Sequence, residues 1–192
     1  MVKIIGIGGS PRKSGNSDML LDEALDGARS AGAATEKIVL NDLNFKACQE
    51  CDGCHDTGIC VIKDDMQFVY QRIEESDGLI IASPIFFGSL TAQLKAMIDR
   101  FQCLWVKRHI LKRPVASKKR KGAFLCVYGS DRSEFFESAK KIVKIFFATL
   151  GIEYLGELSC GNLENVGAVK KEKTVLVRAF ELGEMLAKSL GQ

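Results

Sequence analysis

Four of the seven cysteines of the chain lie close together in the stretch "CQECDGCHDTGIC", which covers residues 48–60. They are Cys48, Cys51, Cys54 and Cys60, with the spacing C-x2-C-x2-C-x5-C. Three thiolates on a compact curl, with a fourth a few residues on, can surround a cuboidal iron–sulfur cluster. The first three positions match the cysteine run of bacterial ferredoxins. The spacing therefore predicts a cluster-binding loop over residues 48–60.

Two alternatives to an iron–sulfur cluster remain open. Structural zinc sites usually hold two cysteine pairs separated by a longer spacer, and the spacing here fits that arrangement less well. A cysteine-rich surface loop without metal is the simplest interpretation. Disulfides rank last, because thiols stay reduced in the cytoplasm, where we expect this protein. His55 follows Cys54 directly and is predicted to be a bystander rather than a ligand.

A second chemical pattern lies in the turn after the first predicted strand, "GSPRKSGNS" at residues 9–17. Pro11 stands where a dinucleotide-binding fingerprint needs glycine, so the pattern is not that of a Rossmann site. A loop of hydroxyl, amide and backbone donors before a helix N-terminus surrounds a phosphate with N–H and O–H groups, and Arg12 can add a charge-assisted contact. The turn predicts a phosphate site; the alternative is an ordinary turn with a capping serine.

The elements that must position these residues alternate between strands and helices. Short apolar or β-branched runs predict strands at residues 2–7, 35–40, 78–83, 123–128 and 153–159. Amphipathic patterns predict helices capped by Ser17 or Asp18, opened by Asp64 and Asp65, and covering residues 90–101, 133–150 and 171–190. This alternation predicts an α/β fold with a parallel sheet and helices on both faces. In such a fold, ligands bind at the carboxyl ends of the strands.

Length and composition narrow the class of protein. A chain of 192 residues fits one domain, here residues 1–192, and the net charge of +3 implies no particular partner. The N-terminus lacks the pattern of a signal peptide, and no apolar run approaches the length of a membrane span. We therefore expect a soluble, cytoplasmic protein without a membrane partner.

A basic stretch at residues 106–122 contains eight Lys and Arg residues. The favoured interpretation is a solvated connection that extends the third helix and leads into the fourth strand. A second interpretation is a docking site for an acidic protein such as ferredoxin, or for a nicotinamide phosphate. Nucleic-acid binding is the weakest of the three, because no nucleic-acid-binding motif accompanies the charges.

The stretches "GSPRKSGNS" and "SPIFFGSLTAQLKAMIDRF" (residues 83–101) resemble the two FMN loops of the flavodoxin-like NAD(P)H-dependent FMN reductase family. Within that family, the subgroup called iron–sulfur flavoproteins carries a compact four-cysteine motif after the second strand, and this chain has that spacing in that place. The resemblance covers residues 3–190. It implies a flavodoxin-like, three-layer, doubly wound fold with a five-stranded parallel sheet in the order 2-1-3-4-5. It also implies FMN, a 4Fe–4S cluster and a homodimer or homotetramer.

The same resemblance implies roles for individual residues. Four residues would hold the FMN phosphate: Ser10, Arg12, Asn16 and Ser17. Five would contact the flavin ring: Pro84, Ile85, Phe86, Phe87 and Gly88. Three would close its other side: Tyr128, Gly129 and Ser130. For one of the two phenylalanines, packing in the core is an equal alternative. No catalytic side chain is predicted, because the flavin itself carries the chemistry.

These observations predict an iron–sulfur flavoprotein, an FMN-dependent oxidoreductase that passes electrons between a carrier such as ferredoxin and an acceptor. One alternative is a cluster-free NAD(P)H-dependent FMN or quinone reductase. Another is a non-enzymatic flavodoxin-like carrier or a zinc-stabilised interaction module. The loop after the second strand leaves the sheet at the edge where the FMN loops lie. We therefore expect cluster and FMN to approach each other within one subunit or across a dimer contact.

Overall fold

The five strands form one parallel sheet in the order β2-β1-β3-β4-β5, which confirms the expected order. The computed structural model describes residues 1–115 and 118–191. The strands are β1 (Lys3–Gly8), β2 (Ala34–Val39), β3 (Gly78–Pro84), β4 (Arg120–Val127) and β5 (Ile152–Cys160). Their bounds agree with the predicted ranges to within three residues. All neighbouring strands pair in parallel, so their carboxyl ends lie at the same edge of the sheet.

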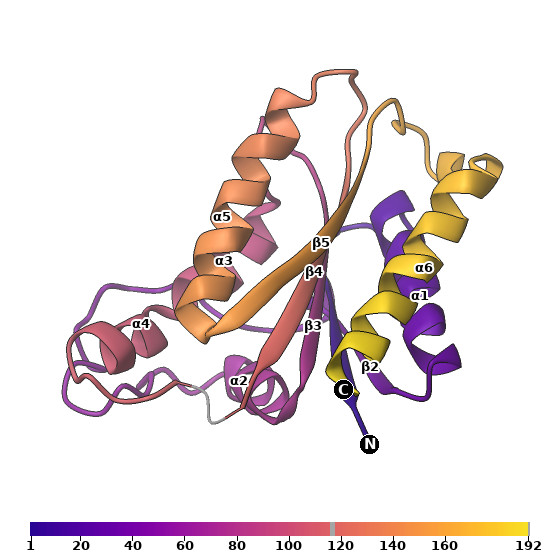
Figure 1. Ribbon diagram of the computed structural model, residues 1–192. Helices are drawn as coiled ribbons and strands as arrows, with labels where there is room; N and C mark the ends of the chain where they lie inside the picture. The colour runs from indigo at the N-terminus through magenta and orange to yellow at the C-terminus, as the bar shows by residue number, and fades with distance from the viewer. Residues whose placement is uncertain (116–117, 192) are drawn as a thin grey trace.

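Helices cover both faces of the sheet (Figure 1). One face carries α1 (Asn16–Ser30) and α6 (Lys173–Leu190). The other carries α2 (Met66–Glu75), α3 (Ala92–Arg100), α4 (Gln102–His109) and α5 (Glu134–Leu150). Two short 3-10 helices, η1 (Leu40–Asp42) and η2 (Ala168–Lys171), interrupt the loops. Among the helices of the described residues, none is both long and apolar enough to cross a membrane.

The central strands divide their side chains between two hydrophobic cores. Ile80 packs under α1 and α6, whereas Ile81 packs under α2, α3 and α5. Leu125 and Phe124 of the neighbouring strand divide in the same way, and all four side chains are fully buried. This is the pattern of strands covered on both faces, in which an apolar run needs no alternation with polar residues.

Two helix boundaries differ from the predicted ones. Helix α1 begins after Gly15, and no side chain caps it, so neither Ser17 nor Asp18 is its N-cap. The Asp18 carboxylate instead accepts a hydrogen bond from the Ser14 backbone N–H at 3.0 Å, which reaches back to the preceding turn. The third predicted helix ends at Arg100, and α4 is a separate helix that begins after a turn at Phe101.

The basic stretch at residues 106–122 leads into β4, which begins at Arg120 on the edge of the sheet where α2 and α5 end. Arg120 is buried and donates hydrogen bonds to the carbonyl oxygens of Ile73, at 3.1 Å, and of Leu150. Positive charge at the C-termini of two helices is favourable, because their unpaired carbonyls carry partial negative charge. Arg120 is therefore a structural cap rather than a solvated residue, and the helix in which the stretch begins is the separate α4 rather than an extension of the third predicted helix. Residues 116 and 117 lie outside the described residues.

Candidate functional site

All four cysteines of the loop line one open pocket of about 750 Å³. Its walls are the last residues of α3, the first turn of α4 and the last turns of α5, including Cys103, Trp105 and Ile145. Helices α3 and α5 run antiparallel to the strands, so their last residues lie far from the carboxyl edge of the sheet. The cysteine loop therefore starts at that edge, after η1, but runs back along the helical layer. In Figure 1 it is the purple segment beside α4 at the lower left.

Left-handed residues curl the cysteine loop. Glu50 and Asp52 have positive φ angles of 48° and 55°, and Gly58 has a φ of 73°. Local hydrogen bonds close two turns, from the His55 N–H to the Asp52 carbonyl and from the Gly58 N–H to the Cys54 carbonyl. Left-handed residues reverse the direction of the backbone within one or two positions. The curl keeps the thiols of a thirteen-residue segment on one pocket.

The two ends of the cysteine loop are joined by Arg100, the last residue of α3. Its guanidinium donates to the Lys46 carbonyl at 2.8 Å, before the first cysteine, and to the Ile62 carbonyl at 3.3 Å, after the last. It also forms a forked ion pair with Asp64, at 2.6 and 3.1 Å. Arg100 is 1% exposed, so this pair is hardly screened by solvent. We call these four residues the loop clasp.

The loop clasp predicts how the stability of the folded protein depends on pH. Burial would raise the pKa of Asp64, but the hydrogen bonds from Arg100 and from two backbone N–H groups outweigh burial and hold this pKa below its usual value. The clasp therefore contributes full stability above the unfolded pKa of about 4. This stability is lost as the pH falls through the lower folded pKa.

Asp64→Asn should lower the melting temperature of the metal-free protein at neutral pH, by the equivalent of about 3 kcal/mol for a broken buried pair. The difference in melting temperature between wild type and Asp64→Asn should become smaller below about pH 4, because wild type then loses the same negative charge. Thermal unfolding at a series of pH values measures this. Asp99→Asn, which breaks an exposed pair with Lys95 on the same helix, should have a much smaller effect. A difference that stays constant down to pH ~2 would contradict the assignment.

The four thiols lie close enough to interact electrostatically. Burial raises the pKa of the Cys54 thiol, and charge on Cys60, Cys48 and Cys51 raises it further. Among the described residues, however, no three His, Cys, Asp or Glu side chains converge on the position of a single ion. A zinc ion needs its sulfur ligands at about 2.3 Å from one point.

A fifth thiol lies beside this loop. Cys103 of α4 is buried, and burial raises its pKa to about 11, with charge on Cys60 adding to the shift. Its thiol lies 3.5 Å from the Arg100 carbonyl oxygen. Nothing in its sequence context distinguishes Cys103 from an ordinary helical residue, so only the fold places it here. Cys126, by contrast, is fully buried in β4 as a small apolar residue.

The predicted phosphate loop lies between β1 and α1. The first N–H groups of α1 have no intrahelical partner, and no side chain caps them. Ser10 faces its own loop, since its hydroxyl donates to the Arg12 carbonyl and accepts from the Arg12 N–H, both at 3.1 Å. Arg12 itself is exposed. The loop thus keeps an uncapped helix end and a free guanidinium, which are the donors that a phosphate needs.

The Asn16 side chain bonds to the segment that follows β5. Its amide group donates to the carbonyls of Leu163 and Asn165, at 3.1 and 2.8 Å, and its oxygen accepts from the Val169 N–H at 3.3 Å. These bonds tie the start of α1 to the loop after β5. We therefore expect Asn16 to serve a phosphate through its backbone N–H rather than through its side chain. Ser17 is buried in the same first turn.

The second predicted FMN loop ends in a tight hairpin. Phe86 and Ser89 exchange two backbone hydrogen bonds of 2.9 and 3.1 Å across Phe87 and Gly88. These two central residues have φ angles of 49° and 73°, as a two-residue turn of this hand requires. Phe87 is fully exposed and Phe86 is 46% exposed, so neither packs in the core. A bulky aromatic residue held at positive φ and left in solvent is unusual and points to a partner for its ring.

The three predicted FMN segments are brought together at the carboxyl edge of the sheet. Thr91 at the start of α3 donates to the Gly9 carbonyl at 2.6 Å, which joins the first two loops. The Ile85 N–H donates to the Val127 carbonyl at 2.8 Å, which joins the second loop to β4. Tyr128 is nearly buried, and its backbone pairs with the loop that follows β5. Thr91 was not among the predicted site residues, although a threonine directly before an apolar helix is a recognisable N-cap signal.

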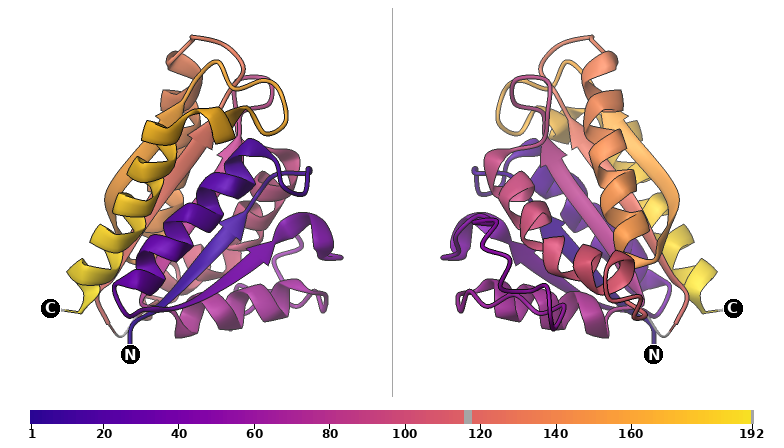
Figure 2. Two further views of the ribbon diagram at one scale, coloured as in Figure 1. Left: turned by 90° about the vertical axis from the view of Figure 1, so that its right-hand side faces the viewer. Right: turned by 90° about the vertical axis from the view of Figure 1, so that its left-hand side faces the viewer.

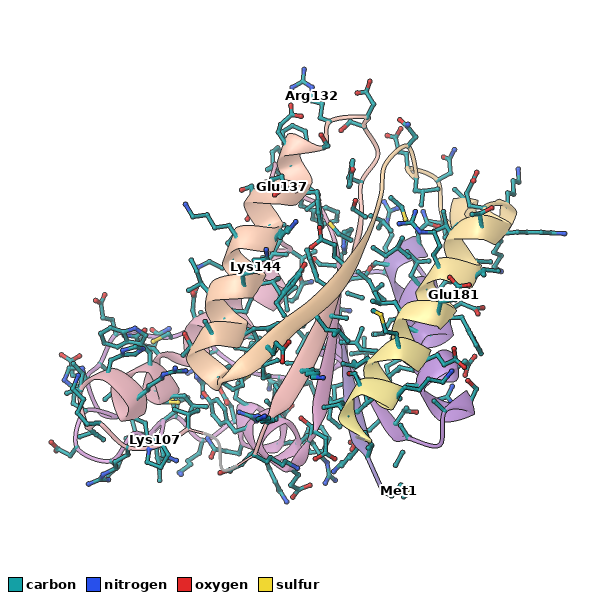
Figure 3. The ribbon with its side chains drawn as sticks, viewed as in Figure 1. Met1, Lys107, Arg132, Glu137, Lys144 and Glu181 are labelled. Atoms are coloured by element: carbon teal, nitrogen blue, oxygen red, sulfur yellow. The ribbon has the colours of Figure 1, made fainter. Side chains whose placement is uncertain are left out.

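The cysteine pocket and the FMN loops lie at opposite ends of the helical layer. Figure 3 labels Arg132, next to the turn after β4, at the top, and Lys107 of α4, against which Gly58 packs, at the lower left. Figure 2 shows the same separation from both sides, with the turns after β3 and β4 above the sheet and the purple loop near its base. Within one chain, the cysteine loop therefore does not lie beside the predicted FMN loops.

Comparison with known proteins identifies related families. Residues 2–160 match the family described as NADPH-dependent FMN reductase. An iron–sulfur flavoprotein from Methanosarcina thermophila is 39% identical over 129 residues, which are 67% of this chain and 64% of that protein. One from Methanocaldococcus jannaschii is 42% identical over 99 residues, 52% of this chain and 51% of that protein. The matched segments thus span between half and two thirds of these relatives.

A solved structure supports the fold independently. The NAD(P)H:quinone oxidoreductase from Methanothermobacter marburgensis superposes with a TM-score of 0.72 over 95% of this chain and 98% of that one. The two sequences are 18% identical. This likeness confirms a flavodoxin-like arrangement of sheet and helices.

Proposed function

The chain belongs to the iron–sulfur flavoprotein subgroup of the NADPH-dependent FMN reductase family, and from this we propose that it is a flavin-dependent oxidoreductase with both FMN and a 4Fe–4S cluster. It passes electrons between a carrier such as ferredoxin and an acceptor. The observation that carries the proposal is the set of four thiols on one pocket in a chain of this family. When bound, FMN supplies one- and two-electron redox chemistry and the cluster single-electron transfer.

The residues of the carboxyl edge have distinct tasks in this proposal. The N-terminus of α1 and Arg12 bind the FMN phosphate, with Ser10 and Ser17 shaping the loop. The segment at residues 84–88, which leads into the hairpin, lies against the flavin ring, and the turn at residues 128–130 closes its other side. The exposed rings of Phe86 and Phe87 exclude water from this side of the site. Cys48, Cys51, Cys54 and Cys60 ligate the cluster.

The distance between the two sites within one chain favours an oligomer. Electron transfer between cluster and flavin needs them to approach, so we propose a homodimer or homotetramer in which the cysteine pocket of one copy meets the FMN loops of another. Exposed apolar residues lie at both sites: Phe87 at the FMN edge, and Trp105 and Ile145 around the cysteine pocket. Such residues are typical of surfaces that become buried in an assembly.

The test is an anaerobic purification followed by an absorption spectrum and analysis of iron, sulfide and zinc. We expect flavin bands with a broad iron–sulfur shoulder and about four irons per chain. Flavin without metal would favour the alternative, a cluster-free NAD(P)H-dependent FMN or quinone reductase. Rapid bleaching of the bound flavin by NADPH would then separate a reductase from a passive carrier.

Arg12→Ala should weaken FMN binding by about 1.5–3 kcal/mol, the typical contribution of one hydrogen bond to a charged group. The guanidinium is exposed, and it belongs to the loop that leads into the uncapped helix end. Titration of the apoprotein with FMN measures the change. Lys13→Ala is the matched control, because Lys13 is the neighbouring cation but pairs with Asp42 at 2.9 Å. Equal FMN affinities of wild type and Arg12→Ala would remove Arg12 from the phosphate site.

A further inference from the structure

One N–H group of the Arg100 guanidinium is not used by the loop clasp. A guanidinium has five N–H donors. Four of them are accounted for by the loop clasp, that is by Lys46, Ile62 and both oxygens of Asp64. The fifth, on Nε, is buried and finds no acceptor among the described residues. A buried N–H without a partner is uncommon in folded proteins and calls for an explanation.

The position of Arg100 supplies that explanation. It lines the same pocket as the four cysteines. Its guanidinium also holds the backbone carbonyl of Ile62, two residues beyond Cys60, at 3.3 Å. Within the described part of the chain, Arg120 also has a buried Nε without an acceptor, but it does not line this pocket. The Nε of Arg72 lies 3.2 Å from the Glu36 carboxylate.

We propose that Arg100 positions the cluster-binding loop and donates its free Nε–H to an anionic sulfur in the cysteine pocket. This inference rests on the proposed function, because it needs a cluster in that pocket. Through the loop clasp, Arg100 fixes both ends of the segment that carries the thiols. Through its charge and its Nε–H, it favours the more negative, reduced form of a cluster, since hydrogen bonds to sulfur and net charge set the potential.

The experiment compares full-length protein purified without oxygen, as wild type and as Arg100→Gln, Arg100→Lys and Asp64→Asn. Iron, sulfide and FMN per chain are measured first. The midpoint potential of the cluster is then measured by a titration followed by electron paramagnetic resonance. Arg72→Gln is the matched control, because it removes the same charge from an arginine outside the pocket.

Arg100→Gln should lose several-fold more iron to a chelator than wild type while it retains FMN. Its remaining clusters should have a more negative potential, because a positive charge and a donor are lost. Asp64→Asn should shift the potential in the opposite direction, because it removes a negative charge and leaves Arg100 in place. Arg100→Lys should recover iron retention in part, and Arg72→Gln should match wild type.

Two results would overturn the inference. One is wild-type iron retention and potential in both Arg100 variants. The other is a shift of the potential in the same direction in Arg100→Gln and Asp64→Asn, as general loosening of the loop would produce. If Arg100→Gln does not fold, as judged by loss of FMN, Arg100→Lys and Asp64→Asn decide in its place. Relative to wild type, the midpoint potential of the cluster should then be more negative in Arg100→Lys and less negative in Asp64→Asn. Absence of iron from wild type would overturn the proposed cluster and this inference together.

Discussion

Replacing Cys51 by alanine should produce a protein that retains FMN and holds little or no iron. Cys51 is an exposed residue in the middle of the cysteine loop, so its thiol contributes little to packing. The loop is fastened at its ends by the loop clasp, and the FMN loops lie at the other end of the helical layer. We therefore expect a change in unfolding free energy within about 0.5 kcal/mol in the metal-free protein.

The measurement is iron, sulfide and FMN per chain after anaerobic purification, beside wild type. Cys103→Ala is the matched control, because Cys103 lines the same pocket but lies on α4, outside the four-cysteine motif. This variant should keep its iron. Full iron in Cys51→Ala would rule out a cluster held by the four predicted ligands. Loss of iron in Cys103→Ala instead would make Cys103 a ligand.

The extent of the central strands β1, β3 and β4 was predictable because each is a short, mainly apolar run that is buried on both faces. Residues 78–83 illustrate this, since their burial follows from the run itself and from its place between two helical patterns. The order of the strands followed from the family resemblance. Helix ends were less predictable. Asp64 and Asp65 were correctly expected to open a helix, and Asp64 does accept from the Met66 N–H at 3.1 Å. Nothing in the local sequence of Gly15 indicates that α1 begins there without a side-chain cap.

The path of the cysteine loop could not be predicted from its own residues. The expectation that it stays near the FMN loops assumed that a loop remains at the edge where it leaves the sheet. Its course is set instead by Arg100, which lies 36 residues beyond Asp64 and joins both ends of the loop. A pairing of this kind has no periodicity and no spacing rule, so it becomes visible only when the helices are in place.

The basic stretch shows that the role of a charged residue depends on which segments the fold brings next to it. Its eight cations suggested either a solvated connection or a docking site. Arg120 fits neither interpretation. Parallel β-α units bring the C-termini of several helices to one edge of the sheet, and a buried cation there bonds to their unpaired carbonyls. Sequence analysis detects the charges, but the carbonyl ends that hold them come from segments far apart in the chain.

The second large effect is expected at the crossing of α1 and α6, where two glycines bring the helix backbones into contact. A Cβ atom at Gly183 would overlap the Ala24 carbonyl, and one at Gly27 would overlap the Phe180 carbonyl. Because the obstacle is backbone rather than a flexible side chain, the helices would have to move apart. Gly183→Ala should therefore lower the unfolding free energy by about 3 kcal/mol, the upper range for overpacking.

The same displacement should reach the FMN site. Helix α1 carries the predicted phosphate loop at its start, and Asn16 fixes that start to the loop after β5. Moving α1 away from α6 strains these bonds, so Gly183→Ala should also bind FMN more weakly. Urea unfolding and an FMN titration measure the two effects. Gly191→Ala, at the end of the same helix, is the matched control, because a Cβ there would lie no closer than 3.8 Å to its nearest neighbour. Equal stability of Gly183→Ala and Gly191→Ala would show that the two helices do not pack backbone to backbone.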